Sequence, residues 1–220
     1  MRYADRTEGG QRLAALLRGR GWHDPIVLAL PRGGVPVAAP IAAALGAPLD
    51  VIVVRKLGAP RQPELAIGAI AEPDIRVLDP TLLDRLRLSG DAVAAIEADE
   101  RLELQRRIHH YRGDHDLPSL AGRSVIVVDD GLATGATAVA ACRAARAAGA
   151  AELVFAVPVG SGSGLELLRA EADEVVCPVV PRAFRAVGQW YERFGQTSDE
   201  EVLAILAAHR VAKPDTDAPR

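Results

Sequence analysis

Short, unbroken apolar runs recur along the chain, and they constrain its fold more than any other feature. None alternates apolar with polar residues, which is typical of strands buried on both faces of a parallel sheet. Helix-like segments lie between the runs, and several end at a glycine suited to a left-handed C-cap. The repetition predicts an α/β fold with an open, mainly parallel five-stranded sheet and helices on both faces. The expected strands are Ile26–Leu30, Asp50–Val54, Ser124–Val128, Leu153–Val157 and Glu174–Pro178, and the expected helices are Thr7–Gly21, Val35–Gly46, Gly135–Gly149 and Gly164–Ala172.

Two stretches do not fit this repeat. Residues 79–112 are charged and helical in pattern with an incomplete apolar stripe, so we expect a helical insertion that packs on the core or on the partner of a homodimer. Residues 181–212 are expected to form a small C-terminal hood and tail, with a last helix that a capping box at Ser198 begins. The core would then span residues 1–180, and residues 213–220 would be a flexible tail.

Composition excludes several classes of protein. With 220 residues and a net charge of −3, the chain carries no basic excess of the kind that predicts nucleic-acid binding. No apolar run is long enough to span a membrane, and the charged N-terminus does not resemble a signal peptide, so a cytoplasmic protein is expected. Cys142 and Cys177 lie in apolar contexts and are expected to be free thiols of a reducing compartment.

The segment Val125–Thr137 carries the clearest chemistry. An apolar strand ends at Val128, two carboxylates follow at Asp129 and Asp130, and a loop of small residues leads into an alanine-rich helix. Ligands of open α/β sheets bind outside the carboxyl ends of strands, and a helix N-terminus behind a small-residue loop offers unpaired N–H groups to a phosphate. The carboxylates are suited to accept hydrogen bonds from hydroxyl groups. A phosphorylated sugar with adjacent hydroxyls matches both halves of the segment.

The same residues have a plainer interpretation, in which Asp130-Gly131 marks a turn and the threonines cap a helix. That interpretation leaves two adjacent acids at a buried strand end without a purpose, where charge is costly. We therefore favour a ligand site.

This run resembles the signature of the type I phosphoribosyltransferases, in which four apolar residues and two acids precede a Thr-Gly-x-Thr sequence. The resemblance implies a Rossmann-like fold and a donor, 5-phosphoribosyl-1-diphosphate (PRPP). Asp129 and Asp130 would hold its ribose hydroxyls. Its 5-phosphate would be wrapped by Ala133, Thr134, Gly135, Ala136 and Thr137.

Two further loops extend the resemblance. Residues 30–34 occupy the place of the family's pyrophosphate loop, which often has a cis peptide bond, so Arg32, Gly33 and Gly34 would bind the diphosphate. Arg55 and Lys56, after the second strand, resemble the cation pair of the adenine enzymes and would share that role.

The following residues, 57–69, are rich in proline and glycine, so we expect a mobile loop. The resemblance implies that this loop closes over the site as a lid. Arg61 and Glu64 are the lid's candidate residues, and Glu64 is a candidate catalytic group that is equally suited to a structural role.

Magnesium is the expected cofactor. Mg²⁺ keeps several waters and uses few protein ligands, so it would be held mainly by the donor and by water, with Asp129 or Asp130 as the candidate protein ligand. The histidines at positions 109, 110 and 115 lack the spacing of a closed metal site.

The acceptor is the open question. Phe184–Tyr191 faintly resembles a stretch of the hypoxanthine-guanine enzymes, so Phe184 and Trp190 are candidates to stack on a nucleobase. The aspartate that those enzymes carry inside the phosphate loop is replaced by Ala133. The whole layout is similar to bacterial phosphoribosyltransferase-domain proteins of unassigned acceptor.

Three functions follow from these residues. The first is a Mg²⁺-dependent phosphoribosyltransferase of nucleotide metabolism, transferring phosphoribose to a nitrogenous acceptor with release of pyrophosphate. The second is a regulator that senses PRPP or another ribose phosphate without turnover, which the absent loop aspartate motivates. The third, which rests on the two aspartates alone, is a phosphohydrolase.

Overall fold

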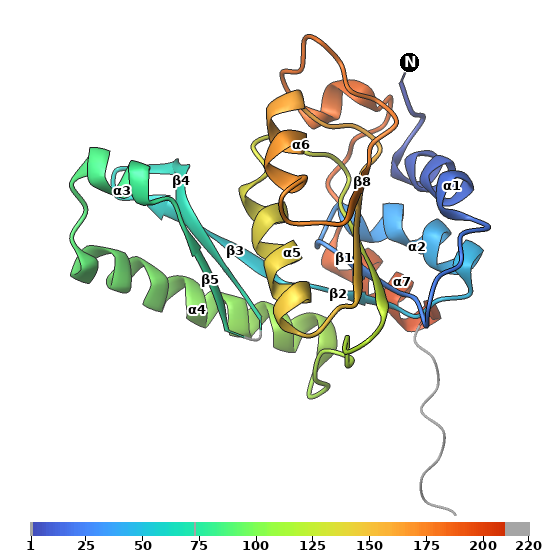
Figure 1. Ribbon diagram of the computed structural model, residues 1–220, viewed down its shortest axis with the longest axis horizontal. Helices are drawn as coiled ribbons and strands as arrows, with labels where there is room; N and C mark the ends of the chain where they lie inside the picture. Colours follow the sequence, from blue (N-terminus) through green and yellow to red (C-terminus); the bar gives the residue numbers. More distant parts are fainter. Residues whose placement is uncertain (1, 73, 210–220) are drawn as a thin grey trace, which may run out of the picture.

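The computed structural model describes residues 2–72 and 74–209 and confirms the predicted α/β fold (Figure 1). Five parallel strands form the central sheet in the order β2-β1-β6-β7-β8. The strand order reverses at β1 and β6, which lie side by side in the middle of the sheet. These strands are β1 (Ile26–Ala29), β2 (Leu49–Val51), β6 (Ser124–Val128), β7 (Glu152–Ala156) and β8 (Glu174–Val176).

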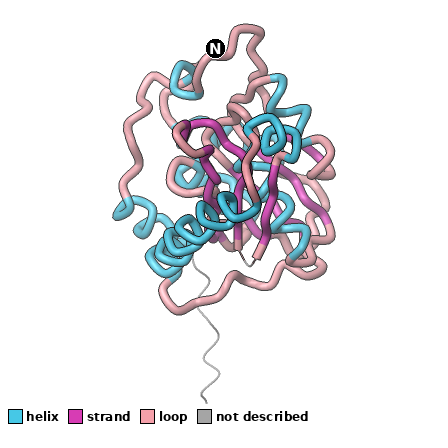
Figure 2. Tube along the Cα trace, turned by 90° about the vertical axis from the view of Figure 1, so that its left-hand side faces the viewer, coloured by secondary structure: helices cyan, strands magenta, loops and turns pink. Residues whose placement is uncertain are grey.

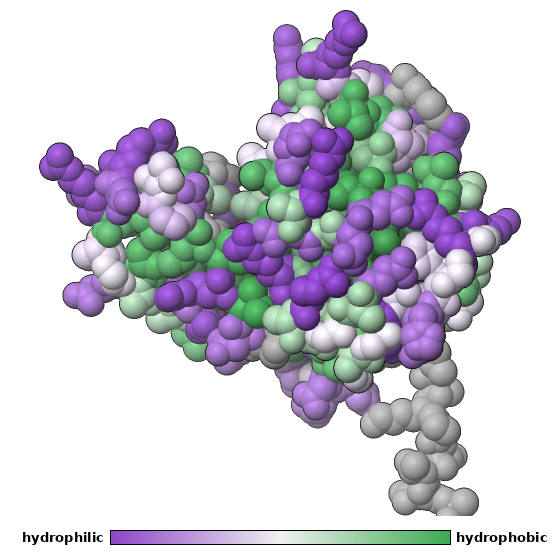
Figure 3. All heavy atoms as spheres, viewed as in Figure 1, coloured by the Kyte–Doolittle hydropathy of each residue, from purple (hydrophilic) through white to green (hydrophobic). Residues whose placement is uncertain are grey.

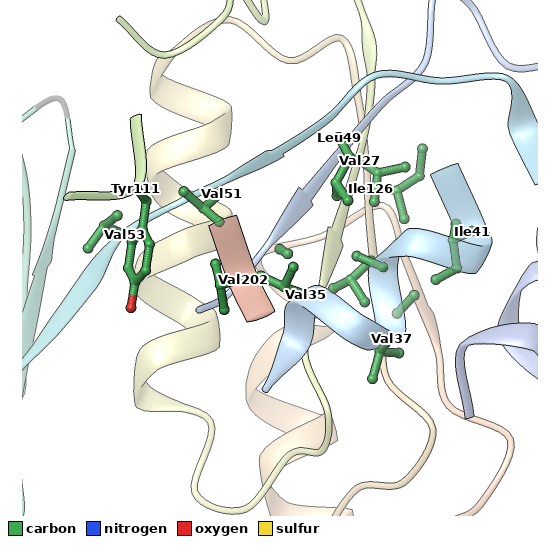
Figure 4. Packing of buried hydrophobic residues seen from close by; sticks show 14 of the residues in the cluster. Val27, Val35, Val37, Ile41, Leu49, Val51, Val53, Tyr111, Ile126 and Val202 are labelled. Atoms are coloured by element: carbon green, nitrogen blue, oxygen red, sulfur yellow. The ribbon is translucent and has the colours of Figure 1, made fainter. Parts of the chain in front are cut away.

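Helices cover both faces of the sheet. Alternate residues of each strand point to opposite faces, so Val27 and Ile126 belong to the buried cluster that includes α2 on one side (Figure 4), while Leu28 and Val127 belong to the cluster that includes α5 on the other. This placement buries every residue of β1 and β6. The first face carries α1 (Arg6–Leu17), α2 (Gly34–Leu45) and α7 (Asp199–His209), and the second carries α5 (Ala136–Ala147) and α6 (Gly162–Leu168).

The second predicted strand differs from the structure because its apolar run crosses between two sheets. Only its beginning, β2, joins the central sheet, where the amide of Ile52 extends the pairing by donating to Ala29. The next amide, of Val53, donates 3.0 Å to the carboxylate of Glu72, and the chain then enters a second sheet at Val54. A continuous apolar run does not reveal where one sheet ends and another begins.

The second sheet is an antiparallel three-stranded arm that projects from the core in Figure 1. The expectation of a loop over residues 57–69 was wrong, because these residues form most of a β-hairpin. The hairpin turns at Pro60-Arg61, and the pairing register shifts at Gly58, so the residues that suggested a loop occupy a turn and a bulge. The arm consists of β3 (Val54–Ala59), β4 (Gln62–Ala71) and β5 (Ile75–Leu78).

The expected helical insertion is present as two helices, α3 (Pro80–Leu86) and α4 (Gly90–Arg112), which separate at Arg87 in a left-handed conformation. Helix α4 runs along the arm and returns to the core, as Figures 1 and 2 show. Its last residue, Arg112, is buried and forms ion pairs with Glu72, which directly follows β4, and with Asp50 of β2. These ion pairs fasten the base of the arm to the central sheet. Figure 3 shows hydrophobic residues on the near face of the arm, between hydrophilic ones.

Residues 181–209, expected to form a hood and tail, follow two separate courses. The short 3₁₀ helix η1 (Val187–Trp190) and the residues after it pair with the start of the chain, where Tyr3 and Tyr191 form a parallel bridge. Helix α7 instead returns to the core and buries Val202 and Leu206 there. The expected flexible tail, residues 213–220, lies outside the described residues. Within the described part of the chain, no helix combines the length and apolar character that crossing a membrane requires.

Candidate functional site

The site lies where β1 and β6 end side by side. Ala29 pairs with Val128 at the carboxyl ends of the two parallel strands, and each strand continues into a loop that leads to a helix N-terminus. The loop after β1 is Leu30–Gly33, and the loop after β6 is Asp129–Gly135. The two loops that the sequence marked for diphosphate and monophosphate are therefore neighbours.

The two aspartates leave part of their carboxylates available. Oδ1 of Asp129 accepts the amide of Asp130 at 2.8 Å, and Oδ2 of Asp130 accepts Nε of Arg6 at 2.8 Å. Among the described residues, nothing donates to Oδ2 of Asp129 or to Oδ1 of Asp130. Each carboxylate thus keeps one oxygen that can accept a hydroxyl proton.

Burial disfavours the charge on both aspartates. It is the main cause that raises the pKa of Asp129 well above its ordinary value, and the neighbouring Asp130 raises it further. Burial also raises the pKa of Asp130, and the guanidinium of Arg6 opposes that rise. Holding two carboxylates here costs stability, which is characteristic of a functional site rather than of a structural turn.

The loop after β6 presents a row of unused backbone donors. Within the described part of the chain, the N–H groups of residues 133–138 donate to no backbone carbonyl. Gly135 has φ of +88° and is the N-cap of α5, so the chain turns into the helix without a side-chain cap. The hydroxyls of Thr134 and Thr137 lie in the same turn. This concentration of N–H groups at a helix N-terminus suits a phosphate.

The loop after β1 approaches the aspartates closely, and its Pro31-Arg32 peptide bond is cis. A Cβ on Gly33 would lie 2.1 Å from Oδ2 of Asp130, and one on Gly34 would lie 2.6 Å from the carbonyl oxygen of Val128. Only glycine allows this contact. In the described structure the amides of Arg32 and Gly33 donate to no backbone carbonyl, so both are available to an anion.

The Arg32 side chain faces the beginning of α7. Its charge contributes to lowering the pKa of Asp199, although the main cause is the hydroxyl of Tyr111, which donates to Asp199 at 2.7 Å. Among the described residues, Arg32 forms no ion pair within 4.0 Å. The guanidinium is therefore near an acid and not bound to one.

The other predicted cations lie on the arm. Arg55 and Lys56 are consecutive in β3, so their side chains point to opposite faces of that sheet. Arg55 forms an ion pair with Glu100 of α4 at 2.6 Å. Together with Arg61 these residues line a cavity of about 420 Å³ between the hairpin and α4. Glu64 lies in β4, and its side chain is outside the description.

The predicted acceptor residues pack in a small apolar cluster. Phe184 and Trp190 are half-buried against Tyr3 and Tyr191, and the buried indole nitrogen of Trp190 has no hydrogen-bond partner among the described residues. Val187 of η1 lies over the bare Cα of Gly131, where a Cβ would meet a methyl carbon at 2.3 Å. The C-terminal hood therefore covers the start of the loop after β6.

Three contributors to the site were not expected from the sequence. Besides Arg6, the hydroxyl of Tyr191 donates 2.6 Å to the backbone carbonyl of Asp130, and that of Ser161 donates to the carbonyl of Ala133. Each acts on a residue far away in the chain, so no local pattern could reveal it. In the described part of the chain, no cluster of three or more histidine, cysteine or acidic side chains is suited to hold a metal.

The fold and the order of these two loops are those that a resemblance to the phosphoribosyltransferases implies. The family model described as "Phosphoribosyl transferase domain" matches residues 5–192, and the chain belongs to that family.

Relatives agree with this assignment. Provisionally named phosphoribosyl transferases from two strains of Mycobacterium tuberculosis, CDC 1551 / Oshkosh and H37Rv, are each 50% identical over 209 residues, which is 94% of this chain. The chain spans about half of their length, 47%.

Among solved structures, the protein TT1426 of Thermus thermophilus is similar with a TM-score of 0.83 and 43% identity, over 96% of this chain and all of that one. The protein AQ2163 of Aquifex aeolicus shares the fold, with a TM-score of 0.51 and 13% identity over 94% of this chain and 87% of its own.

Proposed function

We propose that this protein is a Mg²⁺-dependent transferase that uses PRPP as its donor and passes the phosphoribosyl group to a nitrogenous acceptor. One observation carries the proposal: two aspartates with open carboxylate oxygens lie between a loop of unused amides and a close glycine loop. In a ribose with a 5-phosphate and a 1-diphosphate, the hydroxyls match the two aspartates. The phosphate and the diphosphate match the two loops.

Each part of the donor has its own group of residues in this proposal. The 2- and 3-hydroxyls donate to Asp129 and Asp130, and the 5-phosphate accepts the amides of residues 133–138 and the hydroxyls of Thr134 and Thr137. The diphosphate accepts the amides of Arg32 and Gly33 and the Arg32 guanidinium. Arg55 and Lys56 join it only if the arm moves towards the core, since Arg55 is bound to Glu100 here.

The reaction breaks the bond between the anomeric carbon and the diphosphate oxygen and forms a bond from that carbon to an acceptor nitrogen, which loses a proton. Negative charge grows on the leaving diphosphate and positive charge on the ribose ring. Fixed donors at the diphosphate and carboxylates beneath the ring match that charge distribution, which is the main way such sites accelerate reactions.

The residues present fit magnesium. Because no described cluster is suited to hold a metal by itself, the ion would bind chiefly to donor oxygens and water, with Asp129 or Asp130 completing its shell. When bound, it would neutralise charge on the diphosphate.

Binding and turnover are tested separately. Titration calorimetry with PRPP and MgCl₂ should show one site per chain, and a panel of nucleobases and other amines should release pyrophosphate with at least one member. Thr137→Val should weaken donor binding roughly tenfold, since it removes a hydrogen bond to a charged group. Thr81→Val, an exposed change on α3, is the control. Unchanged activity of Thr137→Val together with phosphate release from simple monoesters would support a phosphohydrolase instead.

A second candidate is a sensor of the donor that does not turn it over. It is favoured by Ala133, because the loop that follows the two aspartates carries no ionisable side chain up to Thr137. Tight PRPP binding without pyrophosphate release across the panel would establish it. A cytoplasmic location and a homodimer remain predictions, and sedimentation equilibrium tests the second.

A further inference from the structure

Arg6 contacts three separate parts of the candidate site. Its Nε donates 2.8 Å to Asp130, and the same nitrogen lies 3.3 Å from the position that a Cβ on Gly33 would take. Its Nη1 donates 2.6 Å to the carbonyl of Gly195, and its guanidinium stacks on the Phe194 ring at 4.0 Å. One side chain therefore joins an aspartate after β6, the glycine loop after β1 and the C-terminal hood.

The position of Arg6 in its own helix offers no local reason for an arginine. It is the first residue of α1, whose N-cap is Asp5. A cation at a helix N-terminus is opposed by the macrodipole, which favours acids there and cations at the other end. The side chain is nevertheless held with only 13% of its surface exposed. The contacts of the Arg6 side chain at the candidate site therefore explain why this position is an arginine.

We propose that Arg6 is a positioning residue of the donor site: it holds the Asp130 carboxylate with one oxygen turned to the ribose, and it fastens the hood to that carboxylate. The inference rests on the proposed function. Arg6 occupies Oδ2 of Asp130 and leaves Oδ1 for a hydroxyl, so it stays in place when the donor binds and does not compete with it.

The charged and titratable groups facing Asp130 support this role. Asp129 precedes it on the same strand end, Arg6 reaches it from α1, and the hydroxyl of Tyr191 bonds its backbone carbonyl from the hood. Among the described residues, Arg6 is the one side chain that donates to the Asp130 carboxylate. Without Arg6, nothing described would fix which of its oxygens is turned to the ribose.

The same side chain links the hood to the site. Residues 187–196, the hood segment, contact the core through Val187 over Gly131, through Tyr191 and through Arg6. Arg193 of the segment also forms an ion pair with Asp5, adjacent to Arg6. Whatever the acceptor is, the segment that covers the phosphate loop is held by the residue that orients the ribose acid.

The test compares Arg6→Gln, Arg6→Lys, Phe194→Leu and a matched control, Arg20→Gln. Arg20 also pairs with a distant acid, Glu174, and also lies near a ring, Trp22 at 5.6 Å, but it is remote from the site. Two quantities are measured: PRPP affinity, and hydrogen exchange of the hood segment in the free protein.

Arg6→Gln should weaken PRPP binding about tenfold to a hundredfold and speed exchange of the hood segment. Arg6→Lys should restore most of the affinity, because its ammonium can still donate to Asp130, but not the slow exchange. Phe194→Leu should speed exchange alone. Arg20→Gln should change neither.

Wild-type hood exchange in Arg6→Gln, or PRPP binding by that variant as tight as or tighter than that of the wild type, would overturn the inference. Tighter binding would mean that Arg6 competes with the donor. Hood exchange needs no donor, so it tests the contact of Arg6 with the hood even if the unmodified protein fails to bind PRPP, which would remove the proposed function instead.

Discussion

The carboxylate of Asp130 lies against the bare Cα of Gly33, with Oδ2 only 2.1 Å from where a Cβ would be. The two residues come from loops that follow different strands, and no other side chain fits between them. The distance makes position 33 a direct test of the site.

Gly33→Ala should weaken PRPP binding roughly a hundredfold while the protein stays folded, because a displacement of about 1 Å at a positioning group has effects of that size. Calorimetry measures the loss, and circular dichroism confirms the fold. Gly21→Ala is the control, since a Cβ there meets nothing within 4 Å. Wild-type affinity in Gly33→Ala would show that the donor does not depend on this contact.

Asp129→Asn should abolish donor binding and stabilise the protein near neutral pH. Burial raises the pKa of Asp129 in the folded state, so folding takes up a proton between the unfolded and the folded pKa. The contribution of Asp129 to the free energy of unfolding is greatest below its pKa in the unfolded state. It falls as the pH rises through its pKa in the folded state. Because asparagine does not titrate, the variant keeps this free energy of unfolding as the pH rises. Each kcal/mol of unfolding free energy gained raises Tm by about 2–4 °C.

Thermal melts at several pH values check this prediction. The wild-type and Asp129→Asn curves should converge in acid and separate towards neutral pH. Curves that remain parallel would show that the carboxylate is not destabilising.

Arg55→Gln and Glu100→Gln should have opposite effects if Arg55 serves the diphosphate. The first removes the cation and should weaken PRPP binding several-fold, whereas the second releases Arg55 from its 2.6 Å ion pair and should leave binding equal or tighter. Calorimetry with PRPP distinguishes the effects of the two variants. An ion pair with a purely structural role would leave binding unchanged in both, and stability would fall by no more than about 1 kcal/mol, because both side chains are about one-quarter exposed.

Gly131→Ala should displace the hood, since a Cβ there would lie 2.3 Å from a methyl carbon of Val187. Hydrogen exchange of the hood segment should accelerate, and the double variant Gly131→Ala with Val187→Ala should restore it. Non-additivity of this kind identifies residues in direct contact. Additive effects would mean that the two positions act independently.

The central sheet was predictable, and the loop after β6 could be proposed as a ligand site, because both depend on local sequence. Buried parallel strands are continuous apolar runs, and the two acids and small residues after β6 mark a ligand loop by their order alone. The arm was not predictable in the same way. Its hairpin carries proline and glycine at a turn and a bulge, and those residues equally suit a mobile loop.

The rest of the candidate site depends on contacts between distant residues. Arg6 and Tyr191 reach Asp130 from opposite ends of the chain, and in the sequence they are one arginine in a charged stretch and one tyrosine in an aromatic tail. Only the fold brings them together. Conversely, Phe184 and Trp190 suggested stacking on a base, but here their rings pack with Tyr3 and Tyr191.

The pairing of Tyr3 with Tyr191 sets the order in which parts of this protein can fold during synthesis. Asp5 and its ion-pair partner Arg193 are 188 positions apart, so during synthesis the first residues must wait until nearly all of the described chain has left the ribosome. The central strands can pair before then. A ribosome-bound chain that stops before residue 190 would thus contain the central strands and the loop after β6 but not the hood. Arg6 would then lack the Phe194 ring on which it stacks.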